Sequence, residues 1–235
     1  MIVAAGEGTR YGGRKQFATL AGRCIVAHAV GALVDHVDGA VVVVPPDVLE
    51  GRGGRFGPLV EELGLAPLAT RCELRLVAGG ASRAASVRSG LAELPGSCEV
   101  VVVHDAARPL ASPALCEAVV EAVRAGAAGA VPALPVHDTV KRVRGREVVE
   151  TVDRTELVRV QTPQAFSTEL LRRAHAGEPE ATDDAGLVEA IGGQVVVVPG
   201  EEWNVKVTDP ADLGLVSFWH ERLSRDRSPG SVRSR

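Results

Sequence analysis

The chain has 235 residues, of which 46% are hydrophobic and only 3% aromatic, so it can form one α/β domain with an aliphatic core. Its net charge of -4 shows no basic footprint, which argues against a nucleic-acid partner and requires local cations for any anionic substrate. Scattered cysteines, no leader-like start and no apolar run of membrane length favour a cytoplasmic protein with no zinc site and no membrane anchor.

The chain opens on a very short predicted strand, residues 1–3, that runs directly into the glycine-rich sequence AAGEGTRYGGRKQ. Small residues let the backbone approach a ligand, and successive N–H groups can cradle phosphate oxygens. The dinucleotide pattern GxGxxG fails because Tyr11 stands where the third glycine is needed, which disfavours a nicotinamide dehydrogenase. The Walker A pattern fails because Gly13 is followed by Arg-Lys-Gln.

The glycine-rich loop carries its own cations, Arg10 and Lys15. When a phosphoanhydride breaks, negative charge builds on the α-phosphate oxygens and on the leaving pyrophosphate. Preplaced cations stabilise that charge without a protein nucleophile. The loop therefore predicts nucleotidyl transfer.

Valine-rich runs and helix-length amphipathic stretches then alternate along the chain. The runs do not alternate apolar with polar residues, so they predict strands buried on both faces, as in a parallel sheet. Strand–helix alternation predicts a doubly wound α/β fold with a mostly parallel sheet. The predicted strands cover residues 40–44, 74–78, 100–103, 129–134 and 195–198. The predicted helices cover residues 25–34, 82–94, 112–125, 170–176 and 183–191.

The strand at residues 100–103 leads into HDAARP, which places Asp105 at its carboxyl end. Ligands bind at this edge of open α/β sheets, and Asp105 could give Mg²⁺ one hard oxygen. Arg108 could then clamp a phosphate. On these residues alone an equal interpretation is that Asp105 caps the next turn and pairs with Arg108. His104 is expected to be structural, since no Ser-His-Asp or Cys-His arrangement is near it.

Residues 136–160 break the pattern with short alternating strands around Arg-Gly-Arg, which predicts a protruding β-arm too polar for the interior of a parallel sheet. Taken alone, such an arm is more often a solvated excursion than an interface. Residues 1–223 are predicted to form one domain that includes this arm. Residues 224–235, rich in Ser and Arg, are predicted to be a disordered tail.

Nine short motifs occur in the order found in the 2-C-methyl-D-erythritol 4-phosphate cytidylyltransferases, which the chain resembles over residues 1–223. They are AAGEGTR, RKQ, GGASRAAS, HDAARP, HDTVKR, TVDR, QTPQAF, TDDA and NVKVT. The resemblance implies a Rossmann-like nucleotidyltransferase fold and a homodimer clasped by the arm. It also implies transfer of CMP from CTP to methylerythritol phosphate, with release of pyrophosphate, in the non-mevalonate route to isoprenoid precursors. Mg²⁺ would be the cofactor, with Mn²⁺ as a substitute.

The resemblance also implies roles for individual residues, motif by motif. The nucleotide would be held by Ala4, Ala5, Gly6, Gly8, Gly80, Ala81 and Ser86. The catalytic cations would be Arg10 and Lys15 at the α-phosphate, with Arg154 and Lys206 at the acceptor. Further acceptor contacts would be Arg108, Thr139, Thr162 and Thr182, and the metal ligand would be Asp105. Thr139 and Arg154 lie on the arm and would serve the neighbouring subunit.

The chain departs from the family pattern at four points. Arg14 replaces the usual proline of PKQ, which predicts a looser and more cationic loop. Ala81 replaces a frequent acidic residue, leaving the backbone to read the nucleotide. Trp203 stands where some members carry an aspartate, so Asp105 would be the only side-chain metal ligand. The apolar residues that usually precede AAG are few, which predicts a start upstream of Met1 or a truncated strand.

Two other functions stay open on the sequence. A related cytidylyltransferase could use another polyol phosphate such as ribitol 5-phosphate, although HDAARP and TDDA favour methylerythritol phosphate. A non-catalytic nucleotide-binding module could use the same fold. The joint presence of Arg10, Lys15 and Asp105 argues for catalysis.

Overall fold

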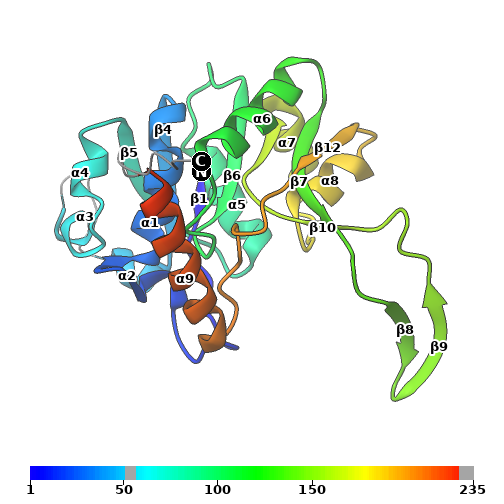
Figure 1. Ribbon diagram of the computed structural model, residues 1–235. Helices are drawn as coiled ribbons and strands as arrows, with labels where there is room; N and C mark the ends of the chain where they lie inside the picture. The colour runs from blue at the N-terminus through cyan, green and yellow to red at the C-terminus, as the bar shows by residue number, and fades with distance from the viewer. Residues whose placement is uncertain (51–56, 228–235) are drawn as a thin grey trace, which may run out of the picture.

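The computed structural model describes residues 1–50 and 57–227, and a sheet of eight strands lies at its centre (Figure 1). The strand order is β10-β7-β11-β6-β1-β4-β5, with β12 also paired to β7. The strands are β1 (Ile2–Val3), β4 (Gly39–Val44), β5 (Glu73–Ala78), β6 (Val100–Asp105), β7 (Gly129–Pro135), β10 (Val158–Val160), β11 (Gln164–Ser167) and β12 (Val195–Pro199).

Most pairings in the sheet are parallel, which confirms the predicted doubly wound, mostly parallel fold. Strands β1, β4, β5 and β6 form a parallel block, and β12 runs parallel to β7. Strand β11 is antiparallel to both β6 and β7, and β10 is antiparallel to β7. Because β1 lies between β4 and β6, the segments that follow these three strands meet at one edge of the sheet.

Helices cover the sheet on both faces, and side-chain caps define where four of them begin. The side chains that accept a backbone N–H from the first turn, as N-caps do, are those of Ser82, Ser112, Ser167 and Asp183. The longer helices are α1 (Ile25–Leu33), α5 (Arg83–Ala92), α6 (Pro113–Arg124), α7 (Thr168–Ala174), α8 (Asp184–Ala190) and α9 (Pro210–Arg227). The short ones are α2 (Pro46–Leu49), α3 (Pro58–Glu62), α4 (Ala66–Ala69) and the 3-10 turns η1 (Lys15–Phe17) and η2 (Val34–His36).

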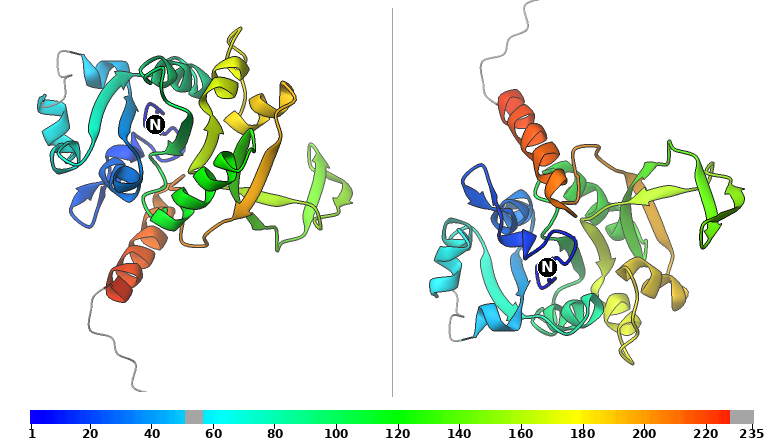
Figure 2. Two further views of the ribbon diagram at one scale, coloured as in Figure 1. Left: turned by 90° about the horizontal axis from the view of Figure 1, so that it is seen from above. Right: turned by 90° about the horizontal axis from the view of Figure 1, so that it is seen from below.

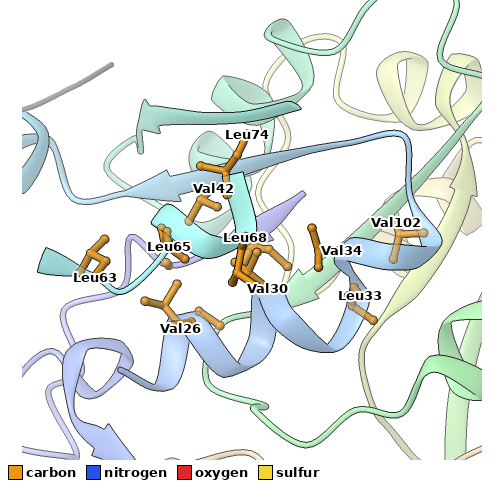
Figure 3. Close-up of a cluster of buried hydrophobic side chains, with 14 of the residues drawn as sticks. Val26, Val30, Leu33, Val34, Val42, Leu63, Leu65, Leu68, Leu74 and Val102 are labelled. Atoms are coloured by element: carbon orange, nitrogen blue, oxygen red, sulfur yellow. The ribbon is translucent and has the colours of Figure 1, made fainter. Parts of the chain in front are cut away.

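Alternate residues of the central strands enter two separate hydrophobic cores. On β4, Val42 and Val44 belong to a core that includes α1 and α6, whereas Val41 and Val43 belong to one that includes α5, α7 and α8. Figure 3 shows part of the first core, where α1 side chains such as Val30 meet Val42. Both strand faces are buried, so β4 needs no polar alternation.

The predicted arm of residues 136–160 extends too far, since Val158–Val160 form β10, which pairs with β7 in the central sheet. The hairpin of the arm stands clear of the rest of the chain in both views of Figure 2. It consists of β8 (Val140–Arg144) and β9 (Glu147–Val152), paired antiparallel around Gly145, whose φ is +59°. A second, small hairpin pairs β2 (Thr19–Leu20) with β3 (Arg23–Cys24).

The C-terminal segment differs from the prediction. Residues 224–227 are the last turn of α9, so a tail that begins at residue 224 is wrong, and residues 228–235 lie outside the described part of the chain. The helix was missed because its apolar residues form no distinct face and Gly214 lies inside it. No helix among the described residues has both the length and the apolar character needed to cross a membrane.

Candidate active site

A cavity of about 600 Å³ opens where β1, β5 and β6 end. Segments far apart in sequence line it because the carboxyl ends of parallel strands meet at one edge of the sheet. The predicted site residues that line it are Ala4, Ala5, Gly6, Gly8, Arg10, Lys15, Gly80, Ala81, Ser86, Asp105 and Lys206. The predicted residues outside its lining are Arg108, Thr139, Arg154, Thr162 and Thr182.

The glycine loop is folded around the backbone carbonyl of Gly8. Its oxygen accepts from the N–H of Tyr11 at 2.9 Å and from that of Gly13 at 3.3 Å. Gly8 has a φ of +66°, and a Cβ there would lie 1.9 Å from the Gly13 carbonyl oxygen. The buried amide of Gln16 donates to the carbonyls of Ala4 at 2.7 Å and Gly6 at 2.9 Å, so it holds the base of the loop. Its role was missed because a glutamine beside two cations carries no sign of burial.

Gly8→Ala is expected to weaken binding of the nucleoside triphosphate that the glycine loop predicts by about tenfold or more, because both a positive φ and a backbone clash oppose a side chain there. Gly12→Ala is the matched control: its φ is +81°, but nothing lies within 4 Å of the added Cβ. Isothermal calorimetry with each of the four nucleoside triphosphates would compare them. Equal losses in the two variants would show that strain alone matters and that the tight Gly8–Gly13 turn does not.

Gly79 and Gly80 form the opposite wall, where backbones approach closely. A Cβ on Gly79 would lie 2.3 Å from the Ala5 Cβ, and one on Gly80 would lie 2.4 Å from the Ala85 Cβ. The Ser86 hydroxyl accepts from the Gly80 N–H at 3.2 Å and so holds this turn. The predicted contacts of Gly80, Ala81 and Ser86 with base and ribose stay predictions.

Asp105 is the more buried of the two carboxylates that line the cavity, the other being Glu7, and cations surround Asp105. Its Oδ2 lies 2.6 Å from Lys206 Nζ, and its Oδ1 lies 3.8 Å from a guanidinium nitrogen of Arg83. Burial by itself raises the pKa of Asp105, but Lys206 and Arg83 more than offset it, and the pKa falls to about 2. The carboxylate is therefore ionised at neutral pH.

Lys15 stands in a field of like charges. Burial lowers its pKa, and the nearby cations Lys206 and Arg10 lower it further. Asp105 and Asp212 oppose this lowering only in part, so a polyanion that binds among these cations is favoured. Lys15, Arg10 and Lys206 all line the cavity, as expected for a triphosphate site.

Arg83 is a cavity residue that the sequence did not single out. It donates to Asp184 at 2.9 Å, and the other Asp184 oxygen lies 3.0 Å from His175 Nε2. Asp184 is only 1% exposed, so α5 and α8 are joined through a buried carboxylate. The signal was present, since Arg83 lies in GGASRAAS and Asp184 in TDDA, but no local pattern shows that these two motifs touch.

Thr162 and His104 form a buried hydrogen-bond chain that holds the backbone of Asp105. His104 Nε2 donates to the Arg108 carbonyl at 2.9 Å, so its Nδ1 accepts from the Thr162 hydroxyl at 3.0 Å. The same hydroxyl accepts from the Asp105 N–H at 3.0 Å. Burial lowers the pKa of His104 to about 4, consistent with the expected structural role. The Arg108 guanidinium donates to the Asn204 carbonyl at 2.7 Å, so Asp105 pairs with Lys206 and not, as the alternative had it, with Arg108.

Three other predicted acceptor residues lie away from this cavity. Thr139 and Arg154 are exposed on the arm, where Arg154 donates to the His137 carbonyl. Thr182 is exposed just before α8. Within one chain, therefore, neither arm residue completes the site.

The donor set at Asp105 fits a hard divalent cation held jointly with phosphate oxygens. No group of three or more His, Cys, Asp or Glu side chains within residues 1–50 and 57–227 could hold a metal by itself. Mg²⁺ commonly takes one or two protein carboxylates and fills its other positions with phosphate oxygens and water. Trp203 packs near Trp219 with ring centroids 6.4 Å apart, and its indole offers an N–H donor but no oxygen for a hard cation.

A glycine loop with its own cations after β1, an ionised aspartate at the end of β6 and a mostly parallel sheet together define a nucleotidyltransferase with a Rossmann-like fold. The family model described as "IspD: 2-C-methyl-D-erythritol 4-phosphate cytidylyltransferase" matches residues 1–222. The chain belongs to this family, as the nine motifs indicated.

Individual relatives agree with the family match. The chain is 43% identical, over 92% of its length and 88% of the relative's, to the 2-C-methyl-D-erythritol 4-phosphate cytidylyltransferase of Streptomyces avermitilis. It is 48% identical, over 91% of its length and 54% of the relative's, to the bifunctional enzyme IspD/IspF of an Anaeromyxobacter species. It thus spans about half the length of the bifunctional curated relatives it matches.

A solved structure shares the fold over nearly the whole chain. The crystal structure of 2-C-methyl-D-erythritol 4-phosphate cytidylyltransferase from Thermus thermophilus superposes with a TM-score of 0.75 at 35% identity. That match covers 94% of this chain and 97% of the other.

Proposed function

We propose that this chain transfers CMP from CTP to 2-C-methyl-D-erythritol 4-phosphate and releases pyrophosphate. The observation that carries the proposal is the convergence of Arg10, Lys15 and Lys206 with ionised Asp105 in one cavity. An oxygen of the acceptor phosphate bonds to the α-phosphorus as the bond to the β-phosphate oxygen breaks. Pyrophosphate leaves with the bonding electron pair.

Positioning and charge stabilisation supply this chemistry. The acceptor phosphate is already an anion near neutral pH, so the attack needs no general base. Lys15 and Arg10 stabilise the charge that builds on the α-phosphate and the leaving group. Lys206, beside Asp105, attracts the acceptor phosphate. Mg²⁺ bound at Asp105 would neutralise phosphate charge and orient the triphosphate.

The test is pyrophosphate release with Mg²⁺, each of the four nucleoside triphosphates, and either methylerythritol 4-phosphate or ribitol 5-phosphate. Release only with CTP and methylerythritol phosphate is expected. Release with CTP and ribitol phosphate would retain the mechanism and change the acceptor. If no combination of nucleotide and acceptor releases pyrophosphate, a non-catalytic nucleotide-binding module is favoured.

We also propose that two copies pair through the arm, so that Thr139 and Arg154 reach the partner's cavity. Three valines on the arm, Val143, Val148 and Val149, are between 52% and 61% exposed, although valine favours burial. Val143 and Val148 are paired across the hairpin, and exposed apolar groups side by side on a protruding element are typical of an interface.

Mixing two inactive variants should restore activity if the arm acts across the dimer. Lys15→Ala damages the cavity and Arg154→Ala damages the arm, so a mixed dimer has one site with both residues intact. About a quarter of wild-type activity is expected from statistical mixing of C2 dimers. Arg146→Ala at the tip of the arm is the control and should be fully active alone. An active monomer in sedimentation, or no recovery from stable mixed dimers, would contradict the clasp.

A further inference from the structure

The glycine loop, residues 4–16, and α2 are two neighbouring segments at the rim of the nucleotide cavity. Glu7, from the loop, and Pro46, the first residue of α2, both line it. Arg14 joins the two segments: its two terminal nitrogens donate to the Asp47 carboxylate at 2.8 Å and 2.9 Å. The pair is bidentate, the geometry in which an Arg–carboxylate contact is most specific.

Arg14 also reaches back to its own loop. One of its nitrogens lies 3.4 Å from Glu7 Oε1. Glu7 is a negative charge facing a cavity suited to a polyanion, and Arg14 offsets part of its repulsion. Two carboxylates share the Arg14 charge, and its bond to Asp47 ties the loop to α2. The looser and more cationic loop expected from the loss of proline stays a prediction.

Little else ties this loop to α2. The hydrogen bonds of Gly8 are internal to the loop, and the side chain of Gln16 fastens the loop's base to Ala4 and Gly6. Among the described residues, no hydrogen bond or ion pair other than that of Arg14 joins residues 6–14 to residues 46–49. A proline at position 14 could not make this contact.

We propose that Arg14 and Asp47 form an ionic latch that holds the glycine loop against α2 and sets the affinity for the nucleoside triphosphate. The inference rests on the proposed function and deepens it. Arg14 is a positioning residue: it does not line the cavity, and it acts through Glu7 and the neighbouring glycines Gly6 and Gly8, which do. The latch should change nucleotide binding and leave acceptor binding and the transfer step alone.

The experiment compares wild-type protein with Arg14→Gln, Asp47→Asn and the double variant. CTP affinity is measured by calorimetry, and kcat and both KM values by pyrophosphate release. Each single variant is expected to raise Kd and KM for CTP about two- to fivefold, the range that one exposed ion pair supports. The double variant should match Arg14→Gln, because both substitutions remove the same Arg14–Asp47 contact and their effects therefore do not add. The KM for the acceptor and the kcat of each variant should stay within about twofold of the wild-type values.

Arg71→Gln is the matched control. It removes another exposed arginine–aspartate pair, that of Arg71 with Asp35, which lies outside the nucleotide cavity. This variant should bind CTP as the wild type does. Unchanged CTP affinity in Arg14→Gln, full additivity in the double variant, or an equal rise in acceptor KM would each overturn the latch. A wild-type protein that binds CTP without transferring CMP would overturn the proposed function instead, and the calorimetry would still decide the latch.

Discussion

Lys15→Ala is expected to lower kcat for CTP-dependent pyrophosphate release by about 10²- to 10³-fold, the effect of removing one preorganised group from a site of developing negative charge. Lys15 lines the cavity, and burial together with Lys206 and Arg10 already disfavours its charge. In the absence of a bound anion, therefore, the positive charge of Lys15 is electrostatically unfavourable at this position. Removing it should relieve that repulsion, so the melting temperature should not fall.

Steady-state kinetics and thermal unfolding of the same preparation would check this prediction. Arg124→Ala is the control, because Arg124 is an exposed cation at the end of α6, outside the cavity and the arm. It should retain wild-type kcat. An unchanged kcat in Lys15→Ala would remove the transition-state role, whereas a large fall in melting temperature would show that Lys15 supports the fold.

Asp105→Asn is expected to lower kcat/KM by about 10²- to 10³-fold, as for loss of one charged partner of the transferring phosphates. Asparagine keeps the size and one oxygen of aspartate but loses the negative charge. That charge lies 2.6 Å from Lys206 and at the end of β6, where a metal held jointly with phosphate would sit.

A Mg²⁺ titration separates the two roles of Asp105. If it holds the metal, the variant should need several times more Mg²⁺ and should recover part of its activity at high concentrations. If it only pairs with Lys206, the Mg²⁺ dependence should match that of the wild type. The second result would contradict the metal role, even if activity is lost.

Prediction from sequence succeeded where one segment carries the whole signal. Unbroken valine runs indicate strands with two buried faces, and β4 and β7 lie within a residue or so of their predicted bounds. Ser82, Ser112 and Asp183 mark helix starts through caps that need only the next turn. Strand β11 was missed, because its four residues are too few to show a pattern of their own.

The residues of the site divide in the same way. Sequence by itself determined the class of chemistry, since Arg10 and Lys15 in a glycine loop and Asp105 after a buried strand suit phosphoanhydride cleavage. The order of nine motifs determined the family, which the family match confirms. Both are properties of short, contiguous segments, whose residue types and spacing are visible without a fold.

Only the tertiary structure decided which charges act together. Lys206 and Arg83 reach Asp105, Asp184 reaches Arg83, and Asp47 reaches Arg14, across separations of 22 to 101 residues. Electrostatic pairing depends on distance in space, and parallel strands with helical crossovers bring distant segments to one edge of the sheet. Arg14 is the clearest case: in sequence it is one more cation in a loop, and in the fold its charge is shared by Asp47 and Glu7.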